Sequence, residues 1–313
     1  MKLLVTGASG FIGKNLLLKI PKKWEVVATY YKTASFVQFI EKERLRNVQA
    51  IQVNLTNFSE TREKLNSVGS NFDVAIHLAA NTDISLSVRE PETDLYCNVT
   101  TLVNTIKSSK IKDVIFISSG AIYDGNKGKV SPKIPLRPSF PYAISKLAAE
   151  HYLVYMKKYR LIDKYLILRF FGAYGPYEPP RKLFTKLVNA FYFEKKREFM
   201  VVGDGNNLID AMYVEDTIRG LLSAIKTDKR DIIVDFTYGN PLTVNQLVMK
   251  AAEIFDIDSV NIKHEGHPIE YITFYASDKQ QKLLFDFEPS ISLEEGFWRL
   301  AKWLEKNRKK KYA

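Results

Sequence analysis

The sequence is poor in cysteine and lacks any long apolar run. Its 313 residues include one cysteine, Cys97, so no disulfide can form within the chain, and we expect a reducing, cytoplasmic compartment. No apolar stretch approaches the ~20 residues that a membrane-spanning helix needs. The first residues read as a strand rather than as a signal peptide, so no membrane contact is expected. Repeats and low-complexity segments are also missing, and no metal site is predicted.

The chain is basic, with a formal net charge of +11 at pH 7. An excess of this kind is typical of proteins that bind nucleic acids. Here, however, the lysines are scattered, apart from a run between Lys306 and Lys311 that is typical of a solvated tail at the end of a helix. We therefore expect no nucleic-acid partner, although a basic surface can steer a phosphorylated ligand.

The strongest motif lies within the first thirteen residues. An apolar run at Leu3–Val5 predicts a buried strand, and Gly7, Gly10 and Gly13 follow it. A helical pattern then begins at Phe11 and Ile12. Glycines let backbone N–H groups approach a pyrophosphate, and the helix directs its positive end at the anion. Strand, turn and helix in this order predict a dinucleotide-binding site, and a purely structural turn is the alternative.

Strand and helix patterns alternate through the first half of the chain. Strands are predicted at residues 25–30, 48–53, 73–77, 113–117 and 164–169, and helices at 36–45, 58–65, 95–106 and 142–155. Repeated βαβ units require right-handed crossovers, which give a parallel sheet covered on both faces. The fold class is therefore α/β, with a doubly wound Rossmann sheet in a dinucleotide-binding domain at residues 1–170.

The rhythm changes at a proline-rich loop, residues 175–180. Helices are predicted beyond it at residues 183–193, 216–225 and 293–304, with short strands between them. We expect residues 171–313 to form a smaller substrate-binding region, from which some segments return to the main sheet.

A second constellation is Tyr142 and Lys146. Residues four apart share one face of a helix, so the Lys146 ammonium can lie beneath the Tyr142 phenol. A free phenol has a pKa near 10 and is a poor base, but a fixed cation nearby lowers its pKa. Upstream, a buried strand ends in the hydroxyls of Ser118 and Ser119, where ligands bind in a doubly wound sheet. A solvated helix face and a capping serine are the structural alternatives.

With these motifs the sequence resembles the extended short-chain dehydrogenase/reductase family, which is the NAD-dependent epimerase/dehydratase group of nucleotide-sugar epimerases, dehydratases and 4-keto reductases. The matching segments span most of the chain: Thr6–Gly13, His77–Ala80, Asn98–Val99, Ser118–Ser119, Pro141–Lys146, Arg169–Pro176, Gly203–Gly205 and Tyr213–Asp216. The resemblance implies that Tyr142 is the acid/base, that Lys146 orients the nicotinamide ribose, and that Ser119 is the third catalytic residue.

A set of binding residues is also expected, most of them from this resemblance, Lys32 from its place after the second strand, and Arg181 and Lys182 from their place near the proline-rich loop. Those expected at the cofactor are Gly7, Gly10, Phe11, Ile12, Gly13, Tyr30, Lys32, Asn54, Leu55, Leu78, Ala79, Ala80, Asn98, Tyr142, Lys146 and Phe171. Those expected at the substrate are Thr82, Ser119, Arg181 and Lys182.

Departures from the family pattern bear on the reaction and the substrate. The family's 4,6-dehydratases carry an Asp-Glu pair where this chain has Gly120 and Ala121, so dehydration is not expected. The family often has an arginine for the diphosphate where Ile209 stands, and an asparagine where Gly172 stands. Basic residues near the proline-rich loop, Arg181 among them, are candidates to take over the anion.

The residues after the second strand bear on the choice of cofactor. NAD-specific folds place an acid there for the adenosine ribose, but no acid occurs between Glu25 and Glu41. Lys32 could pair with a 2′-phosphate, whereas Tyr30 could stack on adenine with either cofactor. NADP is therefore slightly favoured over NAD.

The sequence predicts an NAD(P)-dependent nucleotide-sugar epimerase or 4-keto-sugar reductase. Two alternatives stay open, namely a carbonyl reductase acting on a non-nucleotide substrate and a cofactor-sensing subunit without chemistry. A homodimer is expected through the helices at residues 95–106 and 142–155, with Leu147 and Leu153 partly buried between the subunits.

Overall fold

The computed structural model describes residues 1–268, 272–277 and 279–309, and a parallel sheet of seven strands lies at the centre of this part of the chain. The strand order is β12-β7-β5-β4-β1-β2-β3. The bounds are β1 (Lys2–Thr6), β2 (Glu25–Tyr30), β3 (Val48–Gln52), β4 (Asn71–His77), β5 (Lys110–Ser119), β7 (Ile162–Phe170) and β12 (Ile232–Phe236). The chain runs from β1 outward to β3 and then returns to β4 on the other side. The predicted doubly wound sheet is confirmed, with its switch point between β1 and β4.

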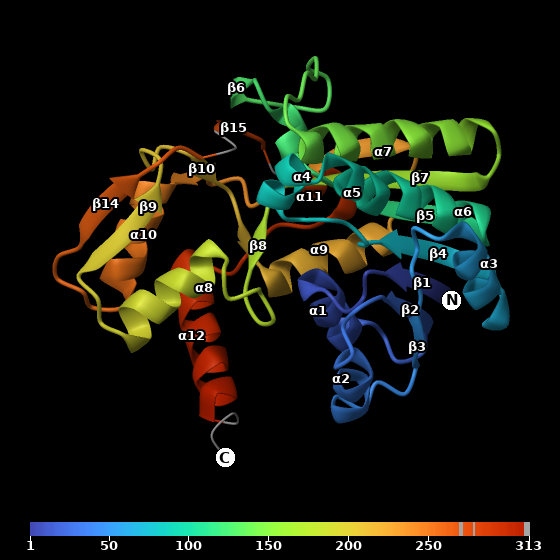
Figure 1. The fold of residues 1–313 in the computed structure, drawn as a ribbon, viewed down its shortest axis with the longest axis horizontal. Helices are drawn as coiled ribbons and strands as arrows, with labels where there is room; N and C mark the ends of the chain where they lie inside the picture. The colour runs from blue at the N-terminus through green and yellow to red at the C-terminus, as the bar shows by residue number, and fades with distance from the viewer. Residues whose placement is uncertain (269–271, 278, 310–313) are drawn as a thin grey trace.

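Helices cover both faces of the sheet (Figure 1). One face packs against α1 (Phe11–Lys19), α2 (Phe36–Lys42), α9 (Val214–Lys226) and α11 (Lys279–Phe285). The other packs against α3 (Phe58–Ser67), α6 (Thr101–Lys107) and α7 (Pro141–Lys158). Alternation along β1 explains this division, because Leu3 and Val5 belong to the first core and Leu4 to the second.

A second lobe follows the proline-rich loop and appears to the left in Figure 1. Its core is formed by α8 (Leu183–Val188), a π-helical turn η3 (Asn189–Phe193), α10 (Val244–Ile254), α12 (Leu293–Lys309) and the strand pair β9 (Glu198–Val202) and β14 (Asn261–Glu265). β12 and α9 lie after residue 170 in the sequence but pack with the main sheet. The domain division at residue 170 stays a prediction.

Short strand pairs connect the two parts. β8 (Ala173–Tyr174) pairs with β11 (Met212–Tyr213), and β10 (Leu208–Ile209) pairs with β13 (Leu242–Thr243). β6 (Lys127–Lys129), in the long loop after β5, pairs with β15 (Thr273–Tyr275). The carboxyl end of β5 is thereby tied to the C-terminal half of the chain.

The structure departs from the predicted helices in several places. The helix predicted at residues 95–106 consists of α5 (Pro91–Leu95), a π-helical turn η1 (Tyr96–Thr100) and α6, and it follows a short helix, α4 (Ile84–Arg89). The wider turn of η1 carries Asn98 into the interior. α2 ends at Lys42 rather than at residue 45, and α10 was not predicted. A capping box between Thr243 and Gln246 marks its start.

Among the described residues, no helix is both long and apolar enough to cross a bilayer. The predicted basic tail lies partly in α12 and partly beyond residue 309, outside the described residues.

Candidate active site

The glycine turn between β1 and α1 is closely packed on two sides. Gly7 has a φ of +62°, and a Cβ added there would lie 2.7 Å from the Ala79 nitrogen. A Cβ on Gly13 would lie 2.5 Å from the Ala8 oxygen. Real Cβ atoms do not approach so closely, so the turn needs glycine at both positions. The loop after β4 therefore lies directly against the turn.

The third glycine, at the start of α1, is less closely packed than the other two. A Cβ on Gly10 would meet only the Gly7 oxygen, at 3.2 Å, within 4 Å. Gly10 is the N-cap residue, no side chain caps the helix, and its first turn carries no acid. The N–H groups of Phe11 and Ile12 in this first turn are thus suited to an anion. The residues present fit the pyrophosphate of a dinucleotide.

Thr6 joins the glycine turn to the loop after β4. Its Oγ1 accepts hydrogen bonds from the N–H groups of Leu78 and Ala79, both at 3.2 Å, and lies 3.0 Å from Nδ1 of His77. Burial, and then the charge of Lys146, lower the pKa of His77 to about 3. His77 is therefore neutral, and the predicted residues Leu78–Ala80 lie beside the turn.

The predicted adenosine end of the site lies at the carboxyl ends of β2 and β3. Tyr30 is half-buried and packs against Phe36, with ring centroids 5.2 Å apart. Lys32 is exposed, and its ammonium lies 5.2 Å from the centre of the Tyr31 ring. Asn54 caps its own turn by accepting from Thr56, and the carbonyl of buried Leu55 accepts from Asn104. Lys32 is therefore placed where a ligand at this strand end could reach it.

Ser119 and Lys146 meet at the carboxyl end of β5. The Ser119 Oγ accepts from the Ala121 N–H at 3.1 Å, which leaves its hydroxyl proton to donate elsewhere. Lys146 is only 3% exposed, donates to the Ile117 oxygen at 2.5 Å and lies 4.3 Å from the centre of the Phe116 ring. The first turns of α7 therefore lie over this strand end.

Tyr142 lies one turn before Lys146 on α7 and is half-buried. Burial lowers the pKa of Lys146 to about 8, and the charges of Glu150 and Asp94 oppose this shift. Lys146 is therefore largely, but not completely, protonated at neutral pH. The structure brings all three predicted catalytic residues to one end of the sheet.

Asn98 holds the loop after β4 in place. Its Oδ1 accepts from the Asn81 N–H at 2.9 Å, and its Nδ2 donates to Asp94 and to Ser145. These contacts give Asn98 a structural role, and its predicted contact with the cofactor stays a prediction. Phe171 lies next to the strand end, because a Cβ on Gly120 would be 3.1 Å from its ring.

Two of the predicted substrate residues, Thr82 and Arg181, lie at the start of α4. The Arg181 guanidinium pairs with Asp83 at 3.4 Å, and Thr82 precedes Asp83 in the chain. This pair joins the loop before α8 to the end of the loop that follows β4. Lys182 is the N-cap residue of α8.

The model of the NAD dependent epimerase/dehydratase family matches residues 3–234, which is well over half of the chain. The chain belongs to this family. The match includes the glycine turn, the β5 strand end and the first turns of α7. All the predicted site residues therefore lie within the matched part of the chain.

Curated members of the family resemble the chain over nearly its whole length. UDP-glucuronate 4-epimerase from Thermodesulfobacterium geofontis is 26% identical over 317 aligned positions, which cover 97% of this chain and 96% of the relative. Human dTDP-D-glucose 4,6-dehydratase is 22% identical, with 98% and 90% of the two chains covered. The family resemblance therefore includes members with different reactions.

Solved structures of family members agree with the fold. UDP-glucose 4-epimerase from Thermotoga maritima, solved with UDP-glucose, has a TM-score of 0.87 at 27% identity and covers 98% of this chain and 100% of its own. UDP-glucuronic acid 4-epimerase from Bacillus cereus, solved with UDP-glucuronic acid and NAD, has a TM-score of 0.85 at 25% identity, with 98% and 100% covered.

Gly172 and Ile209 stand where the family pattern has an asparagine and an arginine, and the structure shows the backbone and packing at both positions. Gly172 has a φ of +151°, a backbone conformation that other residues rarely adopt, and it packs against Ala211. Ile209 is half-buried in the core of the C-terminal lobe. The adjacent Asp210 accepts from the Thr237 hydroxyl and from the Gly239 N–H. Ile209 and Asp210 therefore join the core of the lobe to the loop that follows β12.

Sequence reasoning missed a buried polar network below the β5 strand end. Glu150 on α7 accepts from Ser118 Oγ at 2.5 Å and pairs with Arg169 at 2.8 Å. Arg169 donates to the Tyr123 hydroxyl, which donates to Asp235 at 2.7 Å. Burial raises the pKa of Asp235 to about 6. The spacing of Glu150, four residues after Lys146, was the available signal.

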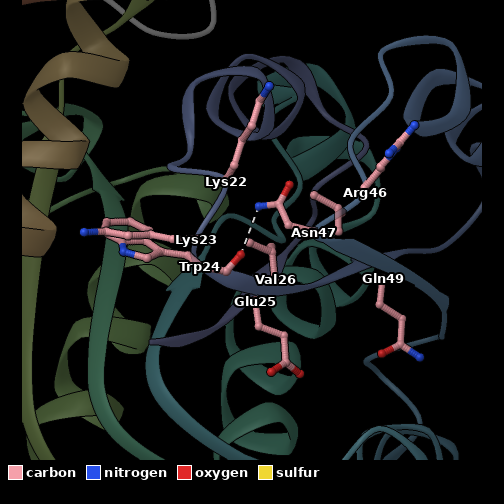
Figure 2. Close-up of a pocket in the computed structure, with 9 residues that line it drawn as sticks. Lys22, Lys23, Trp24, Glu25, Val26, Arg46, Asn47 and Gln49 are labelled. Carbon is pink, nitrogen blue, oxygen red and sulfur yellow. Dashed lines mark hydrogen bonds between the residues drawn. The ribbon is translucent and has the colours of Figure 1, made fainter.

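A surface pocket of about 330 Å³ lies away from this site (Figure 2). It is found at the amino ends of β2 and β3, opposite the strand ends that carry the predicted site. Its lining includes Lys22, Trp24, Arg46 and Asn47, and the Asn47 amide donates to the Trp24 oxygen at 2.9 Å. Ligands of doubly wound sheets bind at the carboxyl ends, so this pocket is not the candidate site.

Gly10, which is less closely packed, and Gly13, which is closely packed, give a direct test of the cofactor site. Gly10→Ala should lower the melting temperature much less than Gly13→Ala does, because its methyl group meets only the Gly7 oxygen, at 3.2 Å. It should weaken dinucleotide binding at least tenfold, about 1.4 kcal/mol. Gly13→Ala should destabilise the fold by about 1–3 kcal/mol through the clash with Ala8. Thermal unfolding and calorimetric titration measure both. Unchanged dinucleotide affinity in a folded Gly10→Ala variant would place the site elsewhere.

Proposed function

We propose that this chain is a nicotinamide-dependent nucleotide-sugar epimerase. The observation that carries the proposal is the meeting of Ser119, Tyr142 and Lys146 at the β5 strand end, beside a glycine turn that fits a pyrophosphate. The names of the similar proteins support it, since both UDP-glucose and UDP-glucuronate 4-epimerases are among them. The sugar and the nucleotide stay open.

In this proposal each residue has a distinct task. A bound nicotinamide would supply the carbon that accepts a hydride from the sugar and returns it. Tyr142, as the phenolate, takes the proton from the sugar hydroxyl and, as the phenol, gives it back. Ser119 donates a hydrogen bond to the same sugar oxygen and so aligns it with Tyr142. Lys146 binds the ribose of the cofactor, and its positive charge favours the ionised form of Tyr142.

Dehydration and 4-keto reduction are the two related reactions that must be distinguished from epimerisation. Dehydration needs an acid and a base beside Ser119, but the 3₁₀ turn there, Gly120–Tyr123, begins with Gly120 and Ala121. We therefore propose that the chain is not a dehydratase. A 4-keto reductase would use the same three residues with a cofactor that dissociates, so co-purification of the cofactor separates it from an epimerase.

Tyr142→Phe tests the proposed acid/base. The substitution removes one hydroxyl and keeps the ring, so folding and cofactor binding should survive, while turnover should fall by ~10²–10⁴-fold. Tyr152→Phe, an exposed tyrosine on the same helix, is the matched control and should keep wild-type turnover. The measurement is interconversion of UDP-glucose or UDP-glucuronate with their 4-epimers. Turnover of Tyr142→Phe within two- or threefold of wild type, by contrast, would favour a different site or a cofactor-sensing role.

We also propose a preference for NADP over NAD. It rests on the absence of an acid after β2 and on the exposed ammonium of Lys32 at that strand end. A 2′-phosphate would pair with this ammonium. The Bacillus cereus epimerase, by contrast, was solved with NAD.

Lys32→Ala is the test of this preference. It should reduce NADP affinity about tenfold and leave NAD affinity within twofold, because only the phosphate contact is lost. Calorimetric titration of both cofactors decides it, with Lys42→Ala as a control at an exposed lysine of α2. Tighter binding of NAD than of NADP by the wild type would refute the proposal.

We propose a homodimer that pairs α5, η1 and α7 with the same elements of a second copy. α7 exposes Ile144, Tyr152 and Tyr155, and Leu95 and Tyr96 are exposed next to it. Exposed apolar side chains gathered on neighbouring helices are typical of an interface. The predicted role of Leu153 in this interface is wrong, because it is fully buried in the core beneath α7.

Light scattering at micromolar concentration should therefore give twice the chain mass of 36.0 kDa. Tyr152→Arg should shift the protein toward the monomer, because each copy would bury an unpaired charge in the interface. Tyr275→Arg, an exposed tyrosine on β15, is the control and should not change the mass. A wild-type monomer at this concentration would contradict the proposed interface.

A further inference from the structure

Lys146 is an ammonium group in an apolar setting. It is almost fully buried, one backbone oxygen accepts from it, and the Phe116 ring lies beside it. A charge moved out of water is costly unless other charges or hydrogen bonds compensate for it. The compensation must come from groups that surround Lys146.

One buried carboxylate lies one turn further along α7. Glu150 is held from two sides, because Ser118 donates to it and Arg169 donates to both of its oxygens, at 3.1 and 2.8 Å. Ser118 precedes Ser119 in β5. Glu150 therefore ties α7 to the two strands, β5 and β7, that lie beneath it, through charge-assisted hydrogen bonds from Arg169.

A second buried carboxylate, on another helix, is bonded to the residue next to Lys146. Asp94 on α5 is 0% exposed and accepts from Asn81 at 2.7 Å, from Asn98 at 3.0 Å and from Ser145 Oγ at 2.5 Å. All three partners donate, so the oxygens of Asp94 are held by hydrogen bonds from three different residues. Ser145 immediately precedes Lys146, and Asn81 belongs to the loop after β4. Asp94 thus fixes the helix and the loop on the two sides of the cofactor site.

The His77 and Arg169 side chains supply no negative charge to Lys146. His77 on β4 is neutral because its pKa is lowered to about 3. Tyr142 lies on the same helix, and the guanidinium of Arg169 on β7 is paired with Glu150. The negative charges that act on Lys146 are those of Glu150 and Asp94, and both favour its protonated form.

We infer that Asp94 and Glu150 are positioning residues for Lys146, which hold its side chain between the β5 strand end and the loop after β4 and keep it charged for the cofactor. The inference rests on the proposed role of Lys146 in cofactor binding. It extends that role to two residues that lie outside the Ser119, Tyr142 and Lys146 set.

The test measures dinucleotide affinity against pH, without any sugar substrate. In the wild type, affinity should fall as pH rises through the pKa of Lys146, about 8, because the ammonium is lost above it. Asp94→Asn and Glu150→Gln each remove a negative charge that favours the ammonium. The midpoint of the fall should therefore move to lower pH, by about half a unit or more in each variant. Titration calorimetry from pH 6 to 10 measures this midpoint.

Two controls separate this effect from a loss of stability. Asp235→Asn removes a buried carboxylate at the far end of the Glu150 network and should leave the midpoint in place. Lys146→Met should abolish the pH dependence of dinucleotide affinity. The double variant Lys146→Met/Asp94→Asn should likewise show no pH dependence. If Glu150→Gln does not fold because Arg169 is left unpaired, the double variant Glu150→Gln/Arg169→Met removes both charges, and Asp94→Asn stands as the independent test.

Midpoints that coincide with that of the wild type in folded Asp94→Asn and Glu150→Gln variants would overturn the inference, as would an equal shift in Asp235→Asn. The outcome is separate from that for the proposed epimerase. Shifted midpoints without turnover of any nucleotide sugar would support the role of the carboxylates and refute the reaction. Turnover without shifted midpoints would do the reverse, and a wild type that binds no dinucleotide would refute both.

Discussion

The burial of one ammonium group, that of Lys146, is the constraint on which much of this structure depends. The proposed contact of Lys146 with a cofactor ribose requires a position beside the end of β5, and that position removes the ammonium from water. Two carboxylates from different helices, Glu150 and Asp94, favour the charged form of Lys146. Each is itself held by donors from further elements, so the constraint spreads from one side chain through α5, α7, β5 and β7.

The glycine turn imposes a second constraint, which is steric rather than electrostatic. Gly7 and Gly13 allow the loop after β4 and the start of α1 to pack without side chains between them. Thr6 then holds that loop by accepting two of its N–H groups. Because the same loop is fixed from the other side by Asn98, through Asn81, the phosphate end and the Lys146 end of the site form one connected structure.

Local patterns predicted much of this arrangement. β2 has the predicted bounds, and β1, β3, β4, β5 and β7 lie within a few residues of theirs, because a buried parallel strand is a short apolar run between turn residues. Spacing four residues apart placed Tyr142 and Lys146 on one helix face. The break of the predicted helix at residues 95–106 could not be foreseen, because the π-helical turn is stabilised by Asn98 contacts with residues from other elements.

By itself, the sequence determined the doubly wound sheet, the glycine turn and the residues at the end of β5, since each depends on periodicity or on neighbours along the chain. Tertiary structure alone decided which side of α7 is core. That helix carries apolar residues on two sides, and packing buries Leu153 while it leaves Tyr152 and Tyr155 exposed. It also decided the charge environment of Lys146, because Asp94 lies 52 positions away in the chain and acts only once α5 has packed against α7. Electrostatic interactions depend on distance in space, which a linear pattern does not record.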